Sequence, residues 1–361
     1  MSDATRQARG QAAWLLGAQR RGLRARLLWP VSLLYRALVA LRRTLYARGL
    51  LKVQRLPVPV IVIGNVVVGG AGKTPCTIAL VQHLRAQGWT PGVVSRGHGR
   101  REAGVLAVLP GSPAADAGDE PLLIRQATGV PVFVAAQRAE AAQALLAAHP
   151  DVNVLVCDDG LQHLALGRDI AVAVFDDRGT GNGWLLPAGL LREPWPPARH
   201  TAFQPDFVLR QSRAGQPAAA LAASPVAPLF NAARRLATEA IGPQGQRMPL
   251  ADLRNQPVTA VAAIARPEVF FDMLRDQGLS LAHTVALPDH ADAAAYAALL
   301  GTAEQGPLLC TEKDAVKLFP LLPHAAAGQP VRAWAVPLEL APDPAFFAAI
   351  DARLATLKPA R

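Results

Sequence analysis

The chain has 361 residues and a formal net charge of +10 at pH 7, a balance that by itself would suggest nucleic-acid binding. The distribution of the charge argues against that class. Residues 1–55 contain twelve lysines and arginines and one acid, whereas the rest of the chain contains 25 basic and 26 acidic side chains. The sequence has no recognisable nucleic-acid-binding motif, so we expect no nucleic-acid partner. The three cysteines are far apart on apolar runs, which argues against a metal cluster or disulfide framework and indicates a reducing, cytosolic compartment.

The basic segment, residues 1–55, has the pattern of an amphipathic helix. Leu34, Leu38, Leu41 and Leu45 recur at helical spacing with arginines among them. The segment also contains the aromatic residues Trp14, Trp29, Tyr35 and Tyr46. Such a helix suits the surface of an anionic membrane, where each basic residue contributes roughly 1 kcal/mol. Its uncharged runs are far shorter than the ~20 residues that span a bilayer. The alternative is an ordinary helix packed on the domain, with its arginines in solvent.

A glycine-rich loop follows the apolar run at 58–63 and leads into a predicted helix at 76–87. The predicted phosphate-binding residues of this loop are Val67, Val68, Gly69, Gly70, Ala71, Gly72, Lys73 and Thr74. In a phosphate loop the backbone N–H groups surround a nucleotide phosphate, the lysine contacts its β/γ oxygens, and the threonine hydroxyl binds Mg²⁺. Val67 departs from the usual pattern, which has glycine there. The alternative is a glycine turn that caps a core helix.

Strand-like and helical runs alternate after residue 58, which predicts an α/β fold with a doubly wound, mostly parallel sheet and helices on both faces. The further predicted elements are strands at 91–95, 131–135, 154–157 and 170–175 and a helix at 138–149. Asp158 and Asp159 end one of these strands. Because parallel sheets bind ligands at the carboxyl ends of their strands, we predict that this pair and Thr74 bind Mg²⁺. A surface turn is the alternative explanation of the aspartate pair.

Residues 211–228 are rich in Ala, Pro, Gly and Ser, which predicts a linker to a smaller α/β lobe. In that lobe we predict strands at 258–264, 281–287, 307–310 and 331–336 and a helix at 267–277. A last helix, at 344–357, could return to the first lobe. The predicted division is a membrane-surface segment at 1–55, a P-loop domain at 56–210, a linker at 211–228, a smaller lobe at 229–340 and a C-terminal helix at 341–361.

Seven short motifs occur along the chain in a distinctive order. They are Gly64-Asn65; Ser95-Arg96-Gly97-His98-Gly99; Gly118-Asp119-Glu120-Pro121; Asp158-Asp159-Gly160-Leu161-Gln162-His163; Gly181-Asn182-Gly183 with Leu186-Pro187-Ala188-Gly189 and Leu191-Arg192-Glu193-Pro194; Pro288-Asp289-His290; and Thr311-Glu312-Lys313-Asp314-Ala315-Val316-Lys317. The series closely resembles the tetraacyldisaccharide 4′-kinases of lipid A biosynthesis, from about Trp29 to Val336. His98 stands where that family more often has tyrosine.

The resemblance implies transfer of the γ-phosphoryl group of ATP to the 4′-hydroxyl of a tetraacylated glucosamine disaccharide 1-phosphate, giving the bis-phosphorylated lipid A precursor, lipid IVA. It implies ATP and Mg²⁺ as cofactors. The implied location is the cytoplasmic face of the bacterial inner membrane. The expected partners are the lipid substrate and the anionic membrane surface, and the sequence points to no protein partner.

The resemblance also assigns roles to residues. It puts the catalytic aspartate at Asp119, with His290 to orient it or share its proton, while Lys73 acts on the transferring phosphoryl group. Without the resemblance, Asp119 and His290 could each simply cap a helix. Glu193 is a further metal candidate, although Arg192 and Glu193 could form a structural pair. The candidate substrate-binding residues are Arg96, Gln162, His163 and Asn182. Two further side chains could bind the substrate 1-phosphate or lie on a solvated face: Lys313 and Lys317.

Two other classes of function share part of this pattern. A membrane-recruited P-loop ATPase acting as a partner-regulated switch would have the phosphate loop, the aspartate pair and the basic segment. Such a switch has no need of a second lobe with Pro288-Asp289-His290. A non-catalytic lipid-binding adaptor would leave Lys73, Thr74 and the paired aspartates without a purpose.

Overall fold

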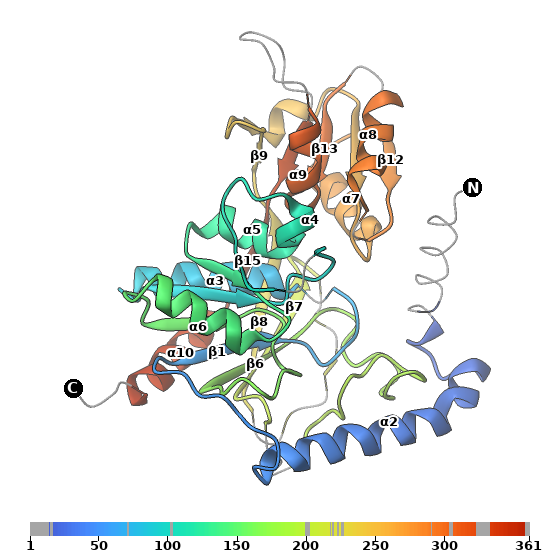
Figure 1. Ribbon diagram of the computed structural model, residues 1–361. Coiled ribbons are helices and arrows are strands. Elements are labelled where there is room, and N and C mark those ends of the chain that lie inside the picture. Colours follow the sequence, from blue (N-terminus) through green and yellow to red (C-terminus); the bar gives the residue numbers. More distant parts are fainter. Residues whose placement is uncertain are drawn as a thin grey trace.

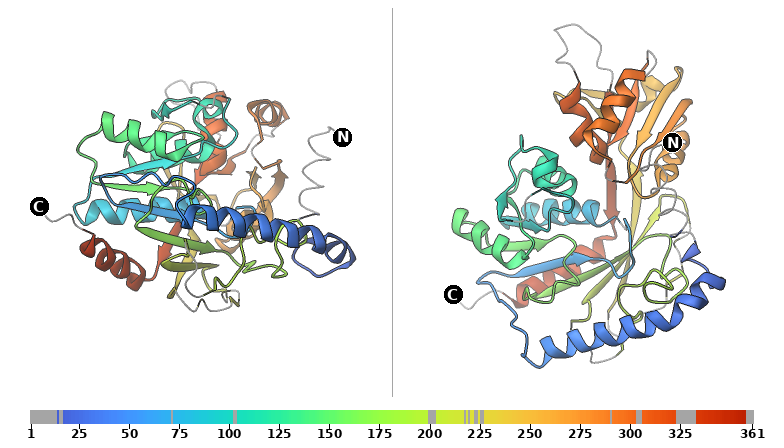
Figure 2. Two further views of the ribbon diagram at one scale, coloured as in Figure 1. Left: turned by 60° about the horizontal axis from the view of Figure 1, so that its bottom comes forward. Right: turned by 45° about the vertical axis from the view of Figure 1, so that its right-hand side comes forward.

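The computed structural model describes residues 14, 17–70, 72–101, 104–198, 203–216, 218, 220, 221, 224, 227–289, 291–302, 306–322 and 333–357. Two sheets organise them, a nine-stranded sheet in a large lobe and a six-stranded sheet in a small one (Figure 1). A long helix, α2 (Leu23–Ala47), runs along the side of the large lobe that faces away from the small lobe (Figures 1 and 2).

The large sheet has the strand order β15-β8-β7-β6-β1-β5-β2-β4-β3. Its strands are β1 (Val60–Gly64), β2 (Pro91–Ser95), β3 (Leu106–Ala107), β4 (Val132–Val134), β5 (Val154–Cys157), β6 (Ile170–Phe175), β7 (Phe207–Arg213), β8 (Leu229–Leu236) and β15 (Leu338–Pro342). The edge strands β3 and β15 pair antiparallel, and the other pairs are parallel. The predicted α/β class with a mostly parallel sheet is confirmed.

Helices cover both faces of this sheet, as its strands require. Ile61 and Ile63 of β1 enter the apolar core on one face, and Val60 and Val62 enter the core on the other, because successive side chains of a strand point to opposite faces. The first core is closed by α3 (Lys73–Ala86), α5 (Asp119–Thr128) and α10 (Pro344–Thr356). The second is closed by α6 (Arg138–Ala148), the loops at 161–191 and the partly buried Tyr35 of α2. A short helix, α4 (Ala114–Ala117), precedes α5.

The small lobe has the strand order β10-β9-β14-β13-β11-β12. Its elements are β9 (Glu239–Ile241), β10 (Arg247–Pro249), η1 (Leu250–Leu253), β11 (Val258–Ala262), α7 (Pro267–Asp276), β12 (Leu281–Ala286), α8 (Ala293–Thr302), β13 (Leu308–Thr311), α9 (Glu312–Leu318), η2 (Phe319–Leu321) and β14 (Ala333–Val336). Val316 of α9 is buried in the core of the large lobe, so this helix packs between the two lobes.

In the order of the chain, the small lobe is inserted between β8 and β15, which are neighbouring strands of the large sheet. This insertion corrects the predicted boundaries. The chain leaves the large sheet after β8 and returns at β15, which pairs with β8. Residues 211–228, the predicted linker, contain the end of β7 and connect β7 to β8 within one sheet. The composition of this connection resembles a linker, but the strands at both of its ends belong to the same sheet.

The C-terminal helix α10 packs on the large lobe. Phe346, Ile350 and Leu354 are buried in its core, and Phe347 stacks on His83 of α3 with ring centroids 4.3 Å apart. These contacts fix the last helix on the same face of the sheet as α3.

The motif at 311–317 has a structural acid, Asp314, at the start of α9. Its side chain is fully buried and accepts hydrogen bonds from the Tyr296 hydroxyl at 2.6 Å, the Thr311 hydroxyl at 2.6 Å and the Ala263 N–H at 2.9 Å. Thr311 in turn caps the helix by accepting from the Asp314 N–H. The acid therefore joins α8 and the start of α9 to the residue that follows β11 within the small lobe.

We predict that Asp314→Ala lowers the free energy of unfolding by about 3 kcal/mol, because it leaves several buried donors without an acceptor. Urea unfolding followed by circular dichroism measures the change. The exposed acid Asp252, in the same lobe, supplies the control Asp252→Ala. Equal stability of the two variants would contradict the assigned role of Asp314.

Candidate active site

The phosphate loop, residues 65–72, connects β1 to α3 at the carboxyl edge of the large sheet. Gly72 has a φ of 71° and turns the chain into α3, whose first two residues are Lys73 and Thr74. Both residues are about 9% exposed. Ala71 lies outside the described residues. The loop therefore opens at the start of a helix, where backbone N–H groups and the helix dipole favour an anion.

Val67 fits the loop because its side chain faces the core. It is 1% exposed and forms an isolated bridge with Leu191. On either side of it, the Val66 carbonyl accepts from the Arg192 N–H and the Val68 N–H donates to the Leu190 carbonyl. The segment 190–192 thus supports the first half of the loop, which explains why a side chain can replace the usual glycine.

The aspartate pair lies at the end of β5, the neighbour of β1. Asp158 is fully buried and accepts from the Thr77 hydroxyl at 2.8 Å, while its Oδ2 atom has no hydrogen-bond partner among the described residues. Burial, reinforced by the charge of Glu120, raises the pKa of Asp158 to about 7. Asp159 lies 3.5 Å from both Lys73 Nζ and Arg192 Nη1. Burial acts to raise the pKa of Asp159, but these cations and Arg138 outweigh it and lower the pKa.

The oxygen donors near the loop suit Mg²⁺ in the way nucleotide-binding enzymes use it. Within the part of the chain that the structure describes, no group of three or more His, Cys, Asp or Glu side chains is placed to hold a metal ion. Mg²⁺ in kinases takes one or two carboxylates and completes its shell with phosphate oxygens and water. A pair of acids, one with a buried oxygen that lacks a partner, matches that requirement.

Glu193 is engaged by two side chains. Arg43 of α2 donates to one carboxylate oxygen at 2.5 Å, and Gln162 donates to the other at 2.8 Å. Gln162 also donates to the Asn65 carbonyl at 3.1 Å and accepts from Arg192 at 3.2 Å. Gln162 and Glu193, both predicted site residues, therefore form one network with α2 and the start of the phosphate loop.

Two other substrate-binding candidates, Arg96 and Asn182, lie outside the network of Gln162 and Glu193. Arg96 is exposed and lines a pocket of about 230 Å³ with His98, Arg100 and Arg101. The Asn182 side chain donates to the Ala188 carbonyl at 2.9 Å and accepts from the Trp184 N–H within its own loop, and it also donates to the Arg20 carbonyl at 3.3 Å.

His163 follows the aspartate pair and Gln162 in the sequence. Burial and the nearby charges of Arg138 and Arg168 lower its pKa to about 4, which favours a neutral ring at pH 7. Its Nε2 atom is buried and has no hydrogen-bond partner among the residues that the structure describes.

Asp119 is the first residue of α5 and is 5% exposed. Its Oδ2 accepts from Lys317 Nζ of α9 at 2.7 Å, and Lys317 also donates to the Ala291 carbonyl at 2.9 Å. Lys313, one turn earlier in α9, donates to Asp289 at 2.9 Å. The two lysines are therefore paired with acids and do not lie on a solvated face.

His290 lies outside the described residues, and the structure does not test its contact with Asp119. Its sequence neighbours on both sides, Asp289 and Ala291, are held by Lys313 and Lys317 of α9. Because Lys317 also binds Asp119, this part of the small lobe meets the start of α5.

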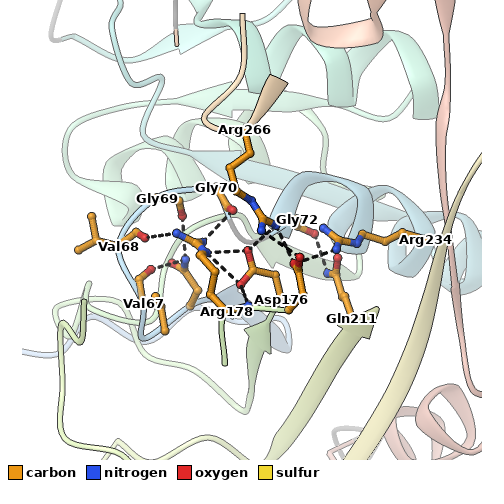
Figure 3. Close-up of polar contacts among 12 residues, drawn as sticks. Val67, Val68, Gly69, Gly70, Gly72, Asp176, Arg178, Gln211, Arg234 and Arg266 are labelled. Atoms are coloured by element: carbon orange, nitrogen blue, oxygen red, sulfur yellow. Dashed lines mark hydrogen bonds and ion pairs between the residues drawn. The ribbon is translucent and has the colours of Figure 1, made fainter. Parts of the chain in front are cut away.

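Several residues without a predicted role shape the phosphate loop. The Asn65 amide donates to the Val67 and Gly69 carbonyls. The Arg178 guanidinium donates to the Val68 and Gly70 carbonyls, and the Gln211 amide donates to the Gly72 carbonyl (Figure 3). Arg178 comes from the loop after β6 and Gln211 from β7. Only Asn65 carried a signal in the sequence, as part of the motif Gly64-Asn65.

Known proteins that are similar to this chain belong to one family. A family model described as tetraacyldisaccharide-1-P 4′-kinase matches residues 24–355. The chain belongs to this family. A tetraacyldisaccharide 4′-kinase of Acidovorax sp. (strain JS42) is 55% identical over 352 residues, which cover 96% of this chain and 94% of the relative. The corresponding protein of Polaromonas naphthalenivorans is 54% identical over 339 residues, 93% of each chain.

A solved structure of the same family has a similar fold. It is the crystal structure of LpxK from Aquifex aeolicus in complex with ATP, with a TM-score of 0.73 and 26% sequence identity. The match covers 91% of this chain and 99% of that one. The resemblance to the tetraacyldisaccharide 4′-kinases is thereby confirmed, and the protein is a kinase.

We predict that Lys73→Ala lowers kcat of the family's kinase reaction by about 10²–10³-fold, the usual effect of removing a group that stabilises transition-state charge. Lys52→Ala, which removes an exposed lysine, is the matched control. Steady-state turnover and thermal melting are measured together. Near-normal turnover in a folded Lys73→Ala protein would exclude the loop from catalysis.

Proposed function

We propose that the protein transfers the γ-phosphoryl group of ATP to the 4′-hydroxyl of a tetraacylated glucosamine disaccharide 1-phosphate and so forms lipid IVA. The observation that carries this proposal is that a protein with a phosphate loop before α3 also has a second lobe whose Lys317 binds the buried Asp119 of the large lobe. Family membership supports the substrate, and the ATP complex of the Aquifex relative supports the nucleotide. A P-loop ATPase switch is not favoured, because such a protein does not need a second lobe that contacts Asp119.

In this proposal the chain's own residues position the nucleotide and neutralise its charge. Lys73 contacts the β/γ oxygens, and Thr74, Asp158 and Asp159 hold Mg²⁺, with Glu193 as a further candidate. Mg²⁺, when bound, neutralises charge on the phosphate oxygens. Lys73 Nζ already lies 3.3 Å from Asn65 Oδ1 and 3.5 Å from Asp159, so its position is set from two sides.

Asp119 is the proposed general base and His290 its partner. A sugar hydroxyl is a poor nucleophile until a base within hydrogen-bond reach removes its proton. Asp119 sits in the large lobe, and Lys317 connects it to the backbone next to His290. Arg96, Gln162, His163 and Asn182 stay proposed contacts of the substrate or of its surroundings.

The acyl chains of such a substrate remain in a membrane, so the enzyme must act at its surface. Along α2, Ala25 and Ser32 are buried, while an apolar set on another side is exposed: Leu23, Leu27, Val31, Leu34, Leu38 and Leu41. Of the helices in the described ranges, none combines the length and apolar character needed to cross a bilayer. We propose that this exposed apolar face, flanked by arginines, binds the cytoplasmic face of the inner membrane peripherally.

Some aromatic residues expected at the membrane instead contact the protein. The Tyr35 hydroxyl donates to the Arg192 carbonyl at 3.0 Å, and the Tyr46 ring packs edge-on against Phe203. Trp29 is 43% exposed and lies beside Trp184, so it can still reach an interface. The proposed membrane contact therefore rests mainly on the leucines.

A phosphate-transfer assay tests the proposed function. The purified full-length protein is incubated with γ-labelled ATP, Mg²⁺ and the disaccharide lipid in detergent. Transfer of label to the lipid at the 4′ position supports the proposal. Release of labelled phosphate to water with an unlabelled lipid would favour the ATPase alternative.

We predict that Asp119→Asn and His290→Ala each lower kcat, and that the double variant loses much less than the product of the two single losses. Residues that act as one catalytic unit behave in this non-additive way. The four proteins of the cycle are compared in the same assay at saturating substrates. Fully multiplicative losses would mean that the two side chains act independently.

We predict that replacing Leu34, Leu38 and Leu41 together by glutamine weakens sedimentation with phosphatidylglycerol vesicles and raises KM for the lipid, with KM for ATP unchanged. The reason is that these side chains are exposed in the free protein and would be buried in the membrane interface. Val105→Gln/Leu109→Gln removes exposed apolar side chains from the large lobe and serves as the control. Equal sedimentation of both variants would contradict the membrane assignment.

A further inference from the structure

Arg178 lies beside the phosphate loop and is almost fully enclosed. Its Nε donates to both carboxylate oxygens of Asp176, at 3.1 and 2.9 Å, and only 5% of its side chain is exposed. Its two terminal nitrogens donate to loop carbonyls, Nη1 to Val68 and Nη2 to Gly70, each at 2.9 Å (Figure 3). Every nitrogen of the guanidinium therefore holds either the loop or the acid next to it.

Because a peptide group is planar, a contact that fixes the direction of a loop carbonyl also fixes the direction of the next N–H group. In a trans peptide the C=O and N–H bonds point opposite ways. When the Val68 carbonyl faces Arg178, the Gly69 N–H must point away from Arg178. The Asn65 amide acts in the same way on the Gly69 carbonyl, which directs the Gly70 N–H. A loop whose carbonyls are held outward presents N–H groups to a phosphate.

The glycine at position 69 makes room for this arginine. Gly69 has a φ of 92°, and a Cβ atom there would lie 3.0 Å from Arg178 Nη1. At the far end of the loop, a Cβ on Gly72 would collide with the Gln211 amide that binds the Gly72 carbonyl. The glycines thus let side chains from β7 and from the loop after β6 approach the backbone closely.

Asp176 and its sequence neighbour Asp177 connect this side of the loop to the small lobe. Arg266, directly before α7, donates to Asp177 at 2.9 and 2.6 Å and to Asp176 at 3.3 Å. Arg234 of β8 donates to Asp177 at 3.1 Å. Burial acts to raise the pKa of Asp177, but hydrogen bonds from Arg266 hold it well below its usual range. Asp176 is 1% exposed, and its carboxylate forms ion pairs with both Arg178 and Arg266.

We propose that Arg178 is a positioning residue for ATP, which sets the N–H groups of the phosphate loop, and that Arg266 makes this setting depend on the small lobe. The inference rests on the proposed use of the loop for ATP. Arg178 acts on the nucleotide through the loop, because its nitrogens face carbonyls and a carboxylate. Arg266 acts one step further away, through the carboxylate that holds Arg178.

The test compares Arg178→Lys, Arg178→Met and Arg266→Gln in the full-length protein. Arg178→Lys keeps a positive charge beside Asp176 but cannot hold two carbonyls and the acid together. Arg235→Ala, which removes an arginine with a 63% exposed side chain from β8, is the matched control. ATP affinity is measured by calorimetry with Mg²⁺ and no lipid, and KM is measured for ATP and for the lipid.

We expect both Arg178 variants to bind ATP at least about tenfold more weakly, with KM for ATP raised in parallel and KM for the lipid unchanged. Arg266→Gln should have an effect in the same direction of about threefold, since Asp176 still holds Arg178. The control should match the parent protein. Melting temperatures measured without nucleotide show whether each variant is folded.

Unchanged ATP affinity in folded Arg178→Lys would overturn the proposal, as would equal losses for ATP and lipid. Failure of the proposed kinase function would appear differently. The parent protein would then bind ATP, and lose affinity on substitution of Arg178, yet leave the lipid unlabelled. That result would support the role of Arg178 and reject the proposed substrate.

Discussion

A phosphate-binding loop requires that several peptide groups point the same way, and each N–H that faces a ligand leaves a carbonyl that needs a donor elsewhere. In this protein side chains supply those donors. Asn65, Arg178 and Gln211 together bind the carbonyls at 67, 68, 69, 70 and 72. Asn65 follows β1, Arg178 lies in the loop after β6, and Gln211 belongs to β7. These three strands are consecutive neighbours in the sheet only because the chain is doubly wound. The order of the strands is thus a condition for the shape of the loop.

Several charged contacts join the small lobe to the large lobe, among them the ion pair of Arg213 with Asp276, and two of them lie next to predicted site residues. Arg266 binds the acids after β6, next to the loop, and Lys317 binds Asp119 at the start of α5. Both contacts pair a cation of the small lobe with a buried or half-buried acid of the large lobe, and losing one partner of such a pair is costly. Two contact points restrict the rotation of one lobe against the other more than a single contact would. The small lobe can therefore hold residues at the site, although the chain joins it to the large sheet only after β8 and before β15.

Periodicity and motif spacing were enough to predict the α/β class, most strands of the large sheet and the phosphate loop, because apolar strands and a Gly-Lys-Thr turn are local signals. The insertion of the small lobe was not predictable in this way. The loop at 214–228 has the composition of a linker, and only the pairing of β7, β8 and β15 shows that it stays within one sheet. The roles of Arg178, Gln211 and Arg266 were not predictable for a related reason. Each acts through backbone carbonyls or acids that are remote in the sequence, and a lone Arg or Gln forms no sequence motif.

The helix α2 connects the proposed membrane surface to the candidate active site. Ser32 binds the Leu185 carbonyl, and Tyr35 binds the Arg192 carbonyl, so the side of α2 opposite to solvent rests on the segment that supports the phosphate loop. Arg43 adds an ion pair with Glu193, whose other oxygen binds Gln162. Ser32, Tyr35 and Arg43 hold the helix at three points along its length to residues 185–193, so α2 cannot tilt without moving that segment. A membrane bound to the exposed side of α2 would therefore lie at a fixed orientation to the phosphate loop, which a substrate anchored by its acyl chains needs in order to reach the γ-phosphate.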